Sequence, residues 1–86
     1  MIVEDHRNIS CGGDPFNYLK SVLKGLQFSL EDGQEAQILL MQDKFPYEKR
    51  LFESVGEVYN LMLLSYLASS GEISVTYRKV PKIDRS

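Results

Sequence analysis

The residue with the clearest chemical potential is Cys11, the only cysteine, which stands in the stretch from Ser10 to Pro15. Aspartate is a favoured N-cap and proline a favoured first helical residue, so Asp14 and Pro15 predict the start of a helix just after it. The first turn of a helix has N–H groups without intrahelical partners and a positive macrodipole end, which favours a thiolate. The carboxylate of Asp14 opposes that effect. We therefore predict a reactive thiol, and the alternative is a small buried hydrophobic side chain.

Gly12 and Gly13 lie between the cysteine and the predicted cap. They are typical of a plain turn that links a strand to a helix. Their backbone N–H groups are also suited to form a nest for an anion, and the sequence leaves both interpretations open. A phosphate-binding loop is a poor match, because the Gly-Lys-Ser/Thr ending of that motif is missing.

His6 is the only histidine, so a Cys–His nucleophile pair would have to use it. In an extended chain it would lie roughly 16 Å from Cys11. We therefore predict an ordinary exposed strand residue. One cysteine and one histidine also predict no metal site, and nothing in the sequence calls for an organic cofactor.

Composition narrows the class of protein. The 86 residues are 43% hydrophobic and 26% charged, as expected for one folded domain. The net charge of −2 and the pI near 5.3 argue against nucleic-acid binding through bulk charge. A single cysteine forms no internal disulfide, and the apolar run 61–64 is too short to cross a bilayer. We expect a soluble, cytoplasmic protein that is not bound to a membrane.

Hydrophobic periodicity predicts the elements that position Cys11. Residues 2–9 fit a short strand and a loop. A helix follows Asp14, and Gly25 ends it unless it runs one turn further to Phe28. Its apolar stripe comprises Phe16, Leu19, Val22, Leu23 and Leu26.

The middle of the chain predicts a strand over 35–42, with a continuous apolar centre, and a helix from Pro46. A glycine in that helix, Gly56, suggests a bend. The expected stripe of the helix comprises Tyr47, Leu51, Phe52, Val55, Val58 and Tyr59.

The last third predicts a β-hairpin that pairs 61–68 with 73–80 through a turn at Gly71. The alternative is that the second helix continues to Ser69, because short apolar runs are ambiguous. In the predicted hairpin, Tyr66 and Tyr77 would face each other across the two strands. We predict one domain over 1–80 and a frayed tail over 81–86. The order is β-α-β-α-β-β, an α/β two-layer sandwich of a four-stranded mixed sheet with both helices on one face.

With this element order and a single cysteine before the first helix, the chain resembles the TusA/SirA family of small sulfur carriers. The resemblance covers roughly residues 2–80. It rests on Cys11 followed by Pro15, on the run from Ile38 to Asp43 leading to Pro46, and on the hairpin through Gly71 to Lys79. The Cys-Pro-x-Pro motif of the family is replaced here by Cys-Gly-Gly-Asp-Pro.

This resemblance implies a function. Members of the family carry sulfur as a cysteine persulfide and pass it between protein partners, so Cys11 would be the carrier. Gly12, Gly13, Asp14 and Pro15 would form the loop that stabilises the persulfide, and a desulfurase or another carrier would supply the sulfur. One alternative is an interaction or regulatory module of the same fold without thiol chemistry. A third interpretation, an RNA-binding domain like the C-terminal domain of a bacterial translation initiation factor, is disfavoured by the acidic pI.

Overall fold

The computed structural model describes residues 1–8 and 14–81. Its elements are β1 (Ile2–Asp5), α1 (Pro15–Ser29), β2 (Glu35–Met41), α2 (Lys49–Val58), β3 (Leu61–Ser69) and β4 (Glu72–Lys79). The strands form one mixed sheet in the order β1-β2-β4-β3, in which β1 is parallel to β2 and the other pairs are antiparallel. The predicted order of elements and the four-stranded mixed sheet are confirmed.

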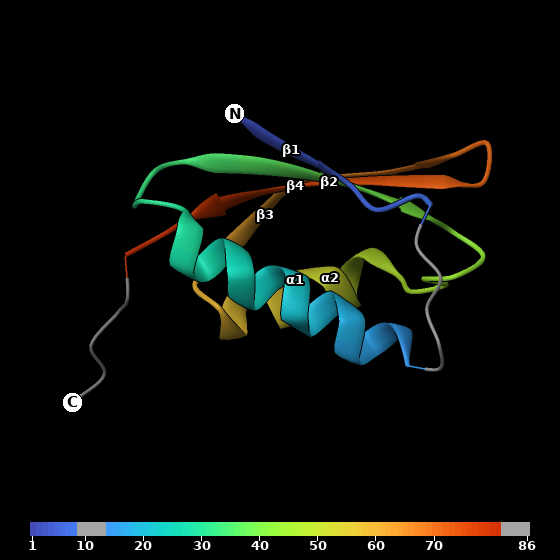
Figure 1. Ribbon diagram of the computed structural model, residues 1–86, viewed down its shortest axis with the longest axis horizontal. Coiled ribbons are helices and arrows are strands. Elements are labelled where there is room, and N and C mark those ends of the chain that lie inside the picture. Colours follow the sequence, from blue (N-terminus) through green and yellow to red (C-terminus); the bar gives the residue numbers. More distant parts are fainter. Residues whose placement is uncertain (9–13, 82–86) are drawn as a thin grey trace.

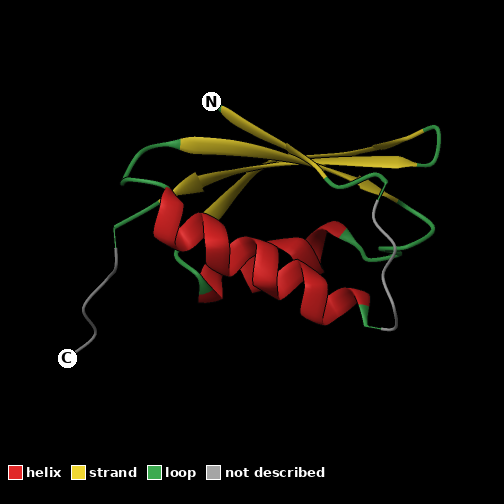
Figure 2. Cartoon of the chain, viewed as in Figure 1, coloured by secondary structure: helices red, strands yellow, loops and turns green. Residues whose placement is uncertain are grey.

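Both helices lie on one face of the sheet, as predicted (Figure 1). Figure 2 shows the resulting two layers, with no described element on the other face. The core lies between the layers because alternate residues of the two central strands point to the helices. These strand residues are Ala36, Ile38 and Leu40 of β2 and Ile73, Val75 and Tyr77 of β4. Within the described ranges, neither helix is long and apolar enough to cross a membrane.

The helix α1 begins where the sequence predicts, with Asp14 as the N-cap and Pro15 as its first residue. Of the two predicted ends, the longer one is correct to within one residue: Gly25 lies inside the helix, which continues to Ser29. The longer helix brings Leu30, its C-cap residue, into the core, where this residue is only 4% exposed. The burial of Leu26 and Leu30 favours the continuous helix over an end at Gly25.

The helix α2 begins at Lys49, three residues later than predicted from Pro46. The preceding segment instead places the side chain of Phe45 fully inside the core. The expected stripe is correct at Phe52 and Val55, which are buried, but wrong at Val58, which is 72% exposed.

The C-terminal hairpin is confirmed, and the alternative of a helix to Ser69 is wrong. Its turn residues Ser70 and Gly71 both have positive φ, as a two-residue type I′ turn requires. A bulge between Leu63 and Ser65 shifts the register, so Tyr66 lies opposite Val75. Tyr66 and Tyr77 are therefore not cross-strand partners, contrary to the prediction.

Candidate functional site

The candidate site is the connection between β1 and α1. Cys11, Gly12 and Gly13 lie outside the described residues, as do residues 82–86 of the predicted tail. Asp14 and Pro15 are described at the C-terminal end of the connection, and His6, Arg7 and Asn8 at its start. The site is therefore built from the two ends of the segment that carries the cysteine.

The side chain of Asp14 occupies the N-terminus of α1. Its Oδ1 accepts hydrogen bonds from the backbone N–H of Phe16 at 3.1 Å and of Asn17 at 3.3 Å. Its Oδ2 accepts a bond of 2.8 Å from the side-chain amide of Asn17. The backbone N–H of Tyr18 donates to the Asp14 carbonyl at 3.1 Å, and Pro15 has no N–H. The amides of the first turn thus already have an acceptor, and the negative charge at the helix end is that of Asp14 itself.

His6 differs from its prediction as an exposed strand residue. It follows the last residue of β1, and its side chain is only 19% exposed. Its Nε2 lies 2.9 Å from Oε1 of Glu4, and its Nδ1 lies 2.8 Å from the hydroxyl oxygen of Tyr18. A carboxylate only accepts, so Nε2–H donates to Glu4, and in the neutral ring Nδ1 accepts from the Tyr18 hydroxyl. Glu4, His6 and Tyr18 therefore form a continuous hydrogen-bonded chain.

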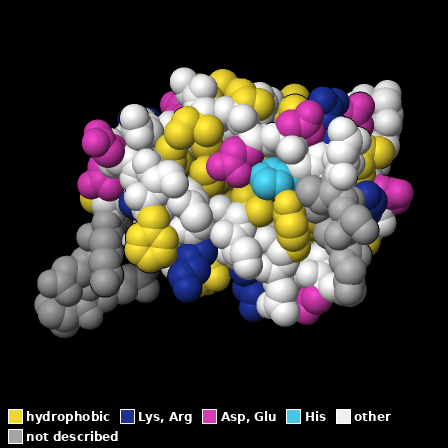
Figure 3. All heavy atoms as spheres, viewed as in Figure 1, with side chains coloured by type: hydrophobic (Ala, Val, Ile, Leu, Met, Phe, Trp, Pro, Cys, Tyr) yellow, Lys and Arg dark blue, Asp and Glu magenta, His cyan; other side chains and the backbone are white. Residues whose placement is uncertain are grey.

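The hydrogen bond between His6 and Tyr18 joins the start of the β1–α1 connection to the first turn of α1. The two rings are also in edge-on contact, with centroids 5.6 Å apart. Figure 3 shows the histidine at the surface of this face, beside hydrophobic and acidic side chains. The sequence carries one signal for it: Glu4 and His6 are two residues apart at the end of the predicted first strand, where alternate side chains share a face. The contact with Tyr18 has no local signal, since it depends on how α1 packs.

Arg7 anchors the start of the same connection. Its guanidinium donates to both carboxylate oxygens of Asp5, at 2.9 and 2.8 Å, and to Glu72 of β4 at 2.7 Å. The side-chain and backbone hydrogen bonds from Arg7 lower the pKa of Asp5 to about 2. The same ion pairs raise the pKa of Arg7. The chain leaving β1 is therefore attached to β4 on the far side of β2.

The described side chains supply three polar groups: a base in His6, a carboxylate at the start of α1 in Asp14, and a cation held by ion pairs in Arg7. Among residues 1–8 and 14–81, no three His, Cys, Asp or Glu side chains are grouped so as to hold a metal ion. The arrangement is suited to proton transfer at the connection, through His6 and Tyr18.

Fold and site define a small two-layer α+β protein with a mixed sheet and a polar cluster at the β1–α1 connection. No protein-family model matches the chain, and a comparison with curated proteins finds no match.

Proposed function

We propose that this protein carries sulfane sulfur as a persulfide on Cys11 and transfers it to a protein partner. The observation that carries the proposal is the start of α1 at Pro15, four residues after the only cysteine of the chain. The cysteine thus belongs to a strand-to-helix connection of a β-α-β-α-β-β fold, as in the TusA/SirA family that the sequence resembles. Its site of action would be the cytoplasm, where thiols stay reduced.

The reaction consists of two sulfur transfers. The thiolate of Cys11 attacks the outer sulfur of a donor persulfide, a new S–S bond forms, and the donor leaves as a thiolate. An acceptor thiolate then attacks the outer sulfur on Cys11, and Cys11 leaves as a thiolate. Each transfer breaks one S–S bond and forms another, so no oxidant or reductant is consumed. The partners are therefore a sulfur donor protein and a sulfur acceptor protein.

The described residues have distinct roles in this proposal. Because Asp14 already accepts from the amides of Phe16 and Asn17, these amides do not hold the persulfide. His6, hydrogen-bonded to the Tyr18 hydroxyl through Nδ1, is the base that this connection offers for the thiol proton. Glu4 accepts from Nε2–H and stabilises the resulting imidazolium.

Intact-protein mass spectrometry tests the proposal. The wild-type protein is incubated with a cysteine desulfurase and cysteine, and a gain of one sulfur atom is expected. Cys11→Ser removes the acceptor thiol and should show no gain. A wild-type protein that stays unmodified, under conditions that load a known sulfur carrier, would reject the proposal.

A variant of the base separates its role from that of the thiol. His6→Gln keeps hydrogen-bonding capacity but cannot act as a base, so loading should slow without loss of the final yield. Tyr18→Phe should slow loading in the same way. Equal loading rates in all three proteins would remove His6 and Tyr18 from the mechanism while leaving Cys11 as the carrier.

A second candidate function, an interaction module without thiol chemistry, is favoured by the uncovered face of the sheet. Exposed apolar side chains lie at both of its edges: Val3 on β1, and Met62 and Leu67 on β3. For this function, Cys11→Ser should bind a partner protein as tightly as the wild type does, whereas Leu67→Lys should weaken binding. Loss of binding in Cys11→Ser would instead favour the sulfur carrier.

A further inference from the structure

The two edges of the sheet differ in their protection against pairing with another chain. In the described part of the sheet, β1 pairs only with β2, and β3 pairs only with β4. The strand β1 is four residues long and ends in two carboxylates, Glu4 and Asp5. The strand β3 is nine residues long and contains no charged residue, no proline and no glycine. Short length, charge and proline are the usual protection of an edge strand, so β1 is protected in this way and β3 is not.

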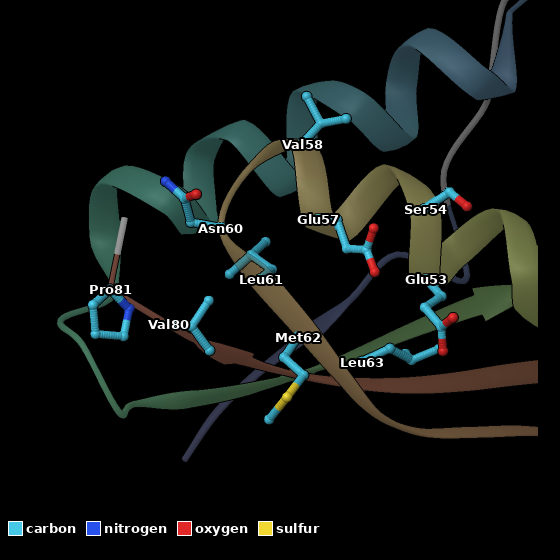
Figure 4. A pocket seen from close by; sticks show the side chains of 10 residues that line it. All are labelled: Glu53, Ser54, Glu57, Val58, Asn60, Leu61, Met62, Leu63, Val80 and Pro81. Carbon is cyan, nitrogen blue, oxygen red and sulfur yellow. The ribbon is translucent and has the colours of Figure 1, made fainter. Parts of the chain in front are cut away.

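Other features protect the first part of β3. Figure 4 shows Leu61 in the groove between the end of α2 and the start of β3, and this residue is only 1% exposed. A bulge between Leu63 and Ser65 then breaks the register with β4. After the bulge, the residues from Ser65 to Ser69 pair regularly with β4 up to the hairpin turn. The unprotected part of the edge is therefore this segment, 65–69.

The segment 65–69 is held on the helix-covered face and open on the other. The ring of Tyr66 packs on that of Phe52, with centroids 5.6 Å apart, and its hydroxyl donates to the carbonyl of Tyr47 at 3.2 Å. Leu67, on the uncovered face, is 64% exposed, and Ala68 is also exposed. Among the described residues, no backbone–backbone hydrogen bond reaches this segment from outside the hairpin. The segment thus has a fixed shape and an open edge.

The pairing with β4 determines which backbone groups of the segment point outward. A two-residue turn closes on a hydrogen-bonded pair, here Ser69 with Glu72, and hydrogen-bonded pairs then alternate along an antiparallel ladder. The N–H and C=O groups of Ser69 and Leu67 therefore point to β4. Those of Tyr66 and Ala68 point away from β4, where an added strand would bind them.

We propose that two copies of the chain pair through the segment 65–69, antiparallel about a twofold axis at Leu67, and join their sheets into one continuous sheet. A twofold axis places the same patch of each copy against itself. Tyr66 of one copy then lies opposite Ala68 of the second copy, and these residues exchange both backbone hydrogen bonds. The strand β1 and its connection to α1 stay at the outer edge of each sheet. The proposal is independent of the chemistry at Cys11.

The side chains are complementary in this register. Leu67 meets its own copy on the axis, in a pair without backbone hydrogen bonds, where opposite side chains are closest. On the helix-covered face, the large side chain of Tyr66 lies beside the small one of Ala68. On the uncovered face, Ser65 lies opposite Ser69 of the second copy, and paired hydroxyl groups stabilise neighbouring strands. The interface therefore forms without placing a charge against its own copy.

The position of the axis follows from the two ends of the segment. A shift by one residue in either direction would bring Leu64 of the bulge or Ser70 of the turn into the ladder. Ser70 has a positive φ, which does not fit an extended strand. Only an axis at Leu67 pairs all residues of the segment 65–69. A second copy is thus the occupant that the segment itself matches.

Sedimentation velocity of the full chain tests the proposal, and its mass should rise from monomer to dimer with concentration. Leu67→Lys places two like charges opposite each other on the axis and should weaken dimerisation at least about tenfold. Val3→Lys is the matched control: Val3 is 54% exposed on the uncovered face of β1, and this variant should dimerise like the wild type. A chain that stays monomeric up to about 1 mM would overturn the proposal. Equal weakening by both variants would also overturn it, because the two sheets would then pack face to face.

Further variants test the register. Ala68→Pro removes an N–H that points away from β4, and edge strands tolerate proline at such positions, so the hairpin should persist while dimerisation is lost. In a Cys11→Ser background, Leu67→Cys should form a disulfide-linked dimer under mild oxidation, because Cα atoms of such opposite residues are about 4.5 Å apart. Ser65→Cys in the same background is the control, since its two copies would lie about 14 Å apart. Cross-linking of Ser65→Cys in place of Leu67→Cys would overturn the proposed axis.

Discussion

Gly56 of α2 lies directly against the ring of Tyr77 of β4. A Cβ atom at position 56 would lie 2.6 Å from Cε1 of Tyr77 and 2.9 Å from the carbonyl oxygen of Leu61. The Tyr77 hydroxyl donates a hydrogen bond of 2.8 Å to the carbonyl of Phe52, one turn earlier in α2. The glycine therefore permits close packing of α2 on the sheet. α2 continues through this glycine, from Lys49 to Val58.

Substitution of Gly56 by alanine tests this packing. Gly56→Ala should lower the free energy of unfolding by about 1–3 kcal/mol, because the added methyl group overpacks a buried contact. This loss should exceed the gain in helix propensity, which is at most about 1 kcal/mol. Gly25→Ala in α1 is the matched control, since no atom lies within 4 Å of its added Cβ. It should stabilise the protein by about 0.5–1 kcal/mol. Urea denaturation of both variants measures these changes, and two changes of the same sign would contradict the packing.

Tyr77 should make the protein sensitive to alkali. Burial raises the pKa of its hydroxyl above the ordinary value of 10.0. The unfolded chain therefore loses this proton first, so the contribution of Tyr77 to stability is complete below pH 10 and is lost as the pH rises further. Tyr77→Phe should cost about 1 kcal/mol at pH 7, because the bond to Phe52 is lost. Between pH 10 and 11.5, the unfolding free energy of the Tyr77→Phe variant should fall less than that of the wild type. Parallel pH profiles of unfolding free energy would refute this assignment.

Asp14 should stabilise the start of α1, and its negative charge should disfavour the thiolate form of Cys11. Asp14→Asn keeps a good N-cap while it removes the negative charge, so the helix should remain stable. Removal of a like charge favours the thiolate, and we expect Cys11 to react about twofold faster with iodoacetamide at pH 7. Asp14→Ala should instead lower the unfolding free energy by about 1 kcal/mol. If Asp14→Asn leaves the alkylation rate unchanged, the charge of Asp14 does not act on Cys11.

The ion pairs of Arg7 give a prediction at acidic pH. Asp5 should titrate at a pKa of about 2, and in Arg7→Ala this pKa should return toward 3.8. Because the folded-state pKa is the lower one, the stabilisation is present above pH 4 and is lost as the pH falls toward 2. NMR titration of the Asp5 carboxyl carbon measures both values. An ordinary pKa in the wild type would mean that the ion pairs do not form in solution.

The sequence by itself was sufficient for the order and type of all six elements, because periodicity and turn residues are local signals. The Asp14–Pro15 cap and the hairpin turn at Gly71 were located correctly for that reason. The end of α1 was left between two alternatives, and the start of α2 was placed three residues too early. Leu30 and Phe45 are both buried by contacts with the opposite layer, and these contacts decide where α1 ends and where α2 begins.

The candidate site divides in the same way. The sequence alone identified Cys11 and its position before a helix, since both are properties of neighbouring residues. Only the tertiary structure joined His6 to Tyr18, twelve residues apart, and Arg7 to Glu72, sixty-five residues apart. It also revealed that Gly56 makes room for the ring of Tyr77. Such contacts arise from the packing of layers, and a one-dimensional pattern of hydrophobicity and charge carries no record of which distant side chains that packing brings together.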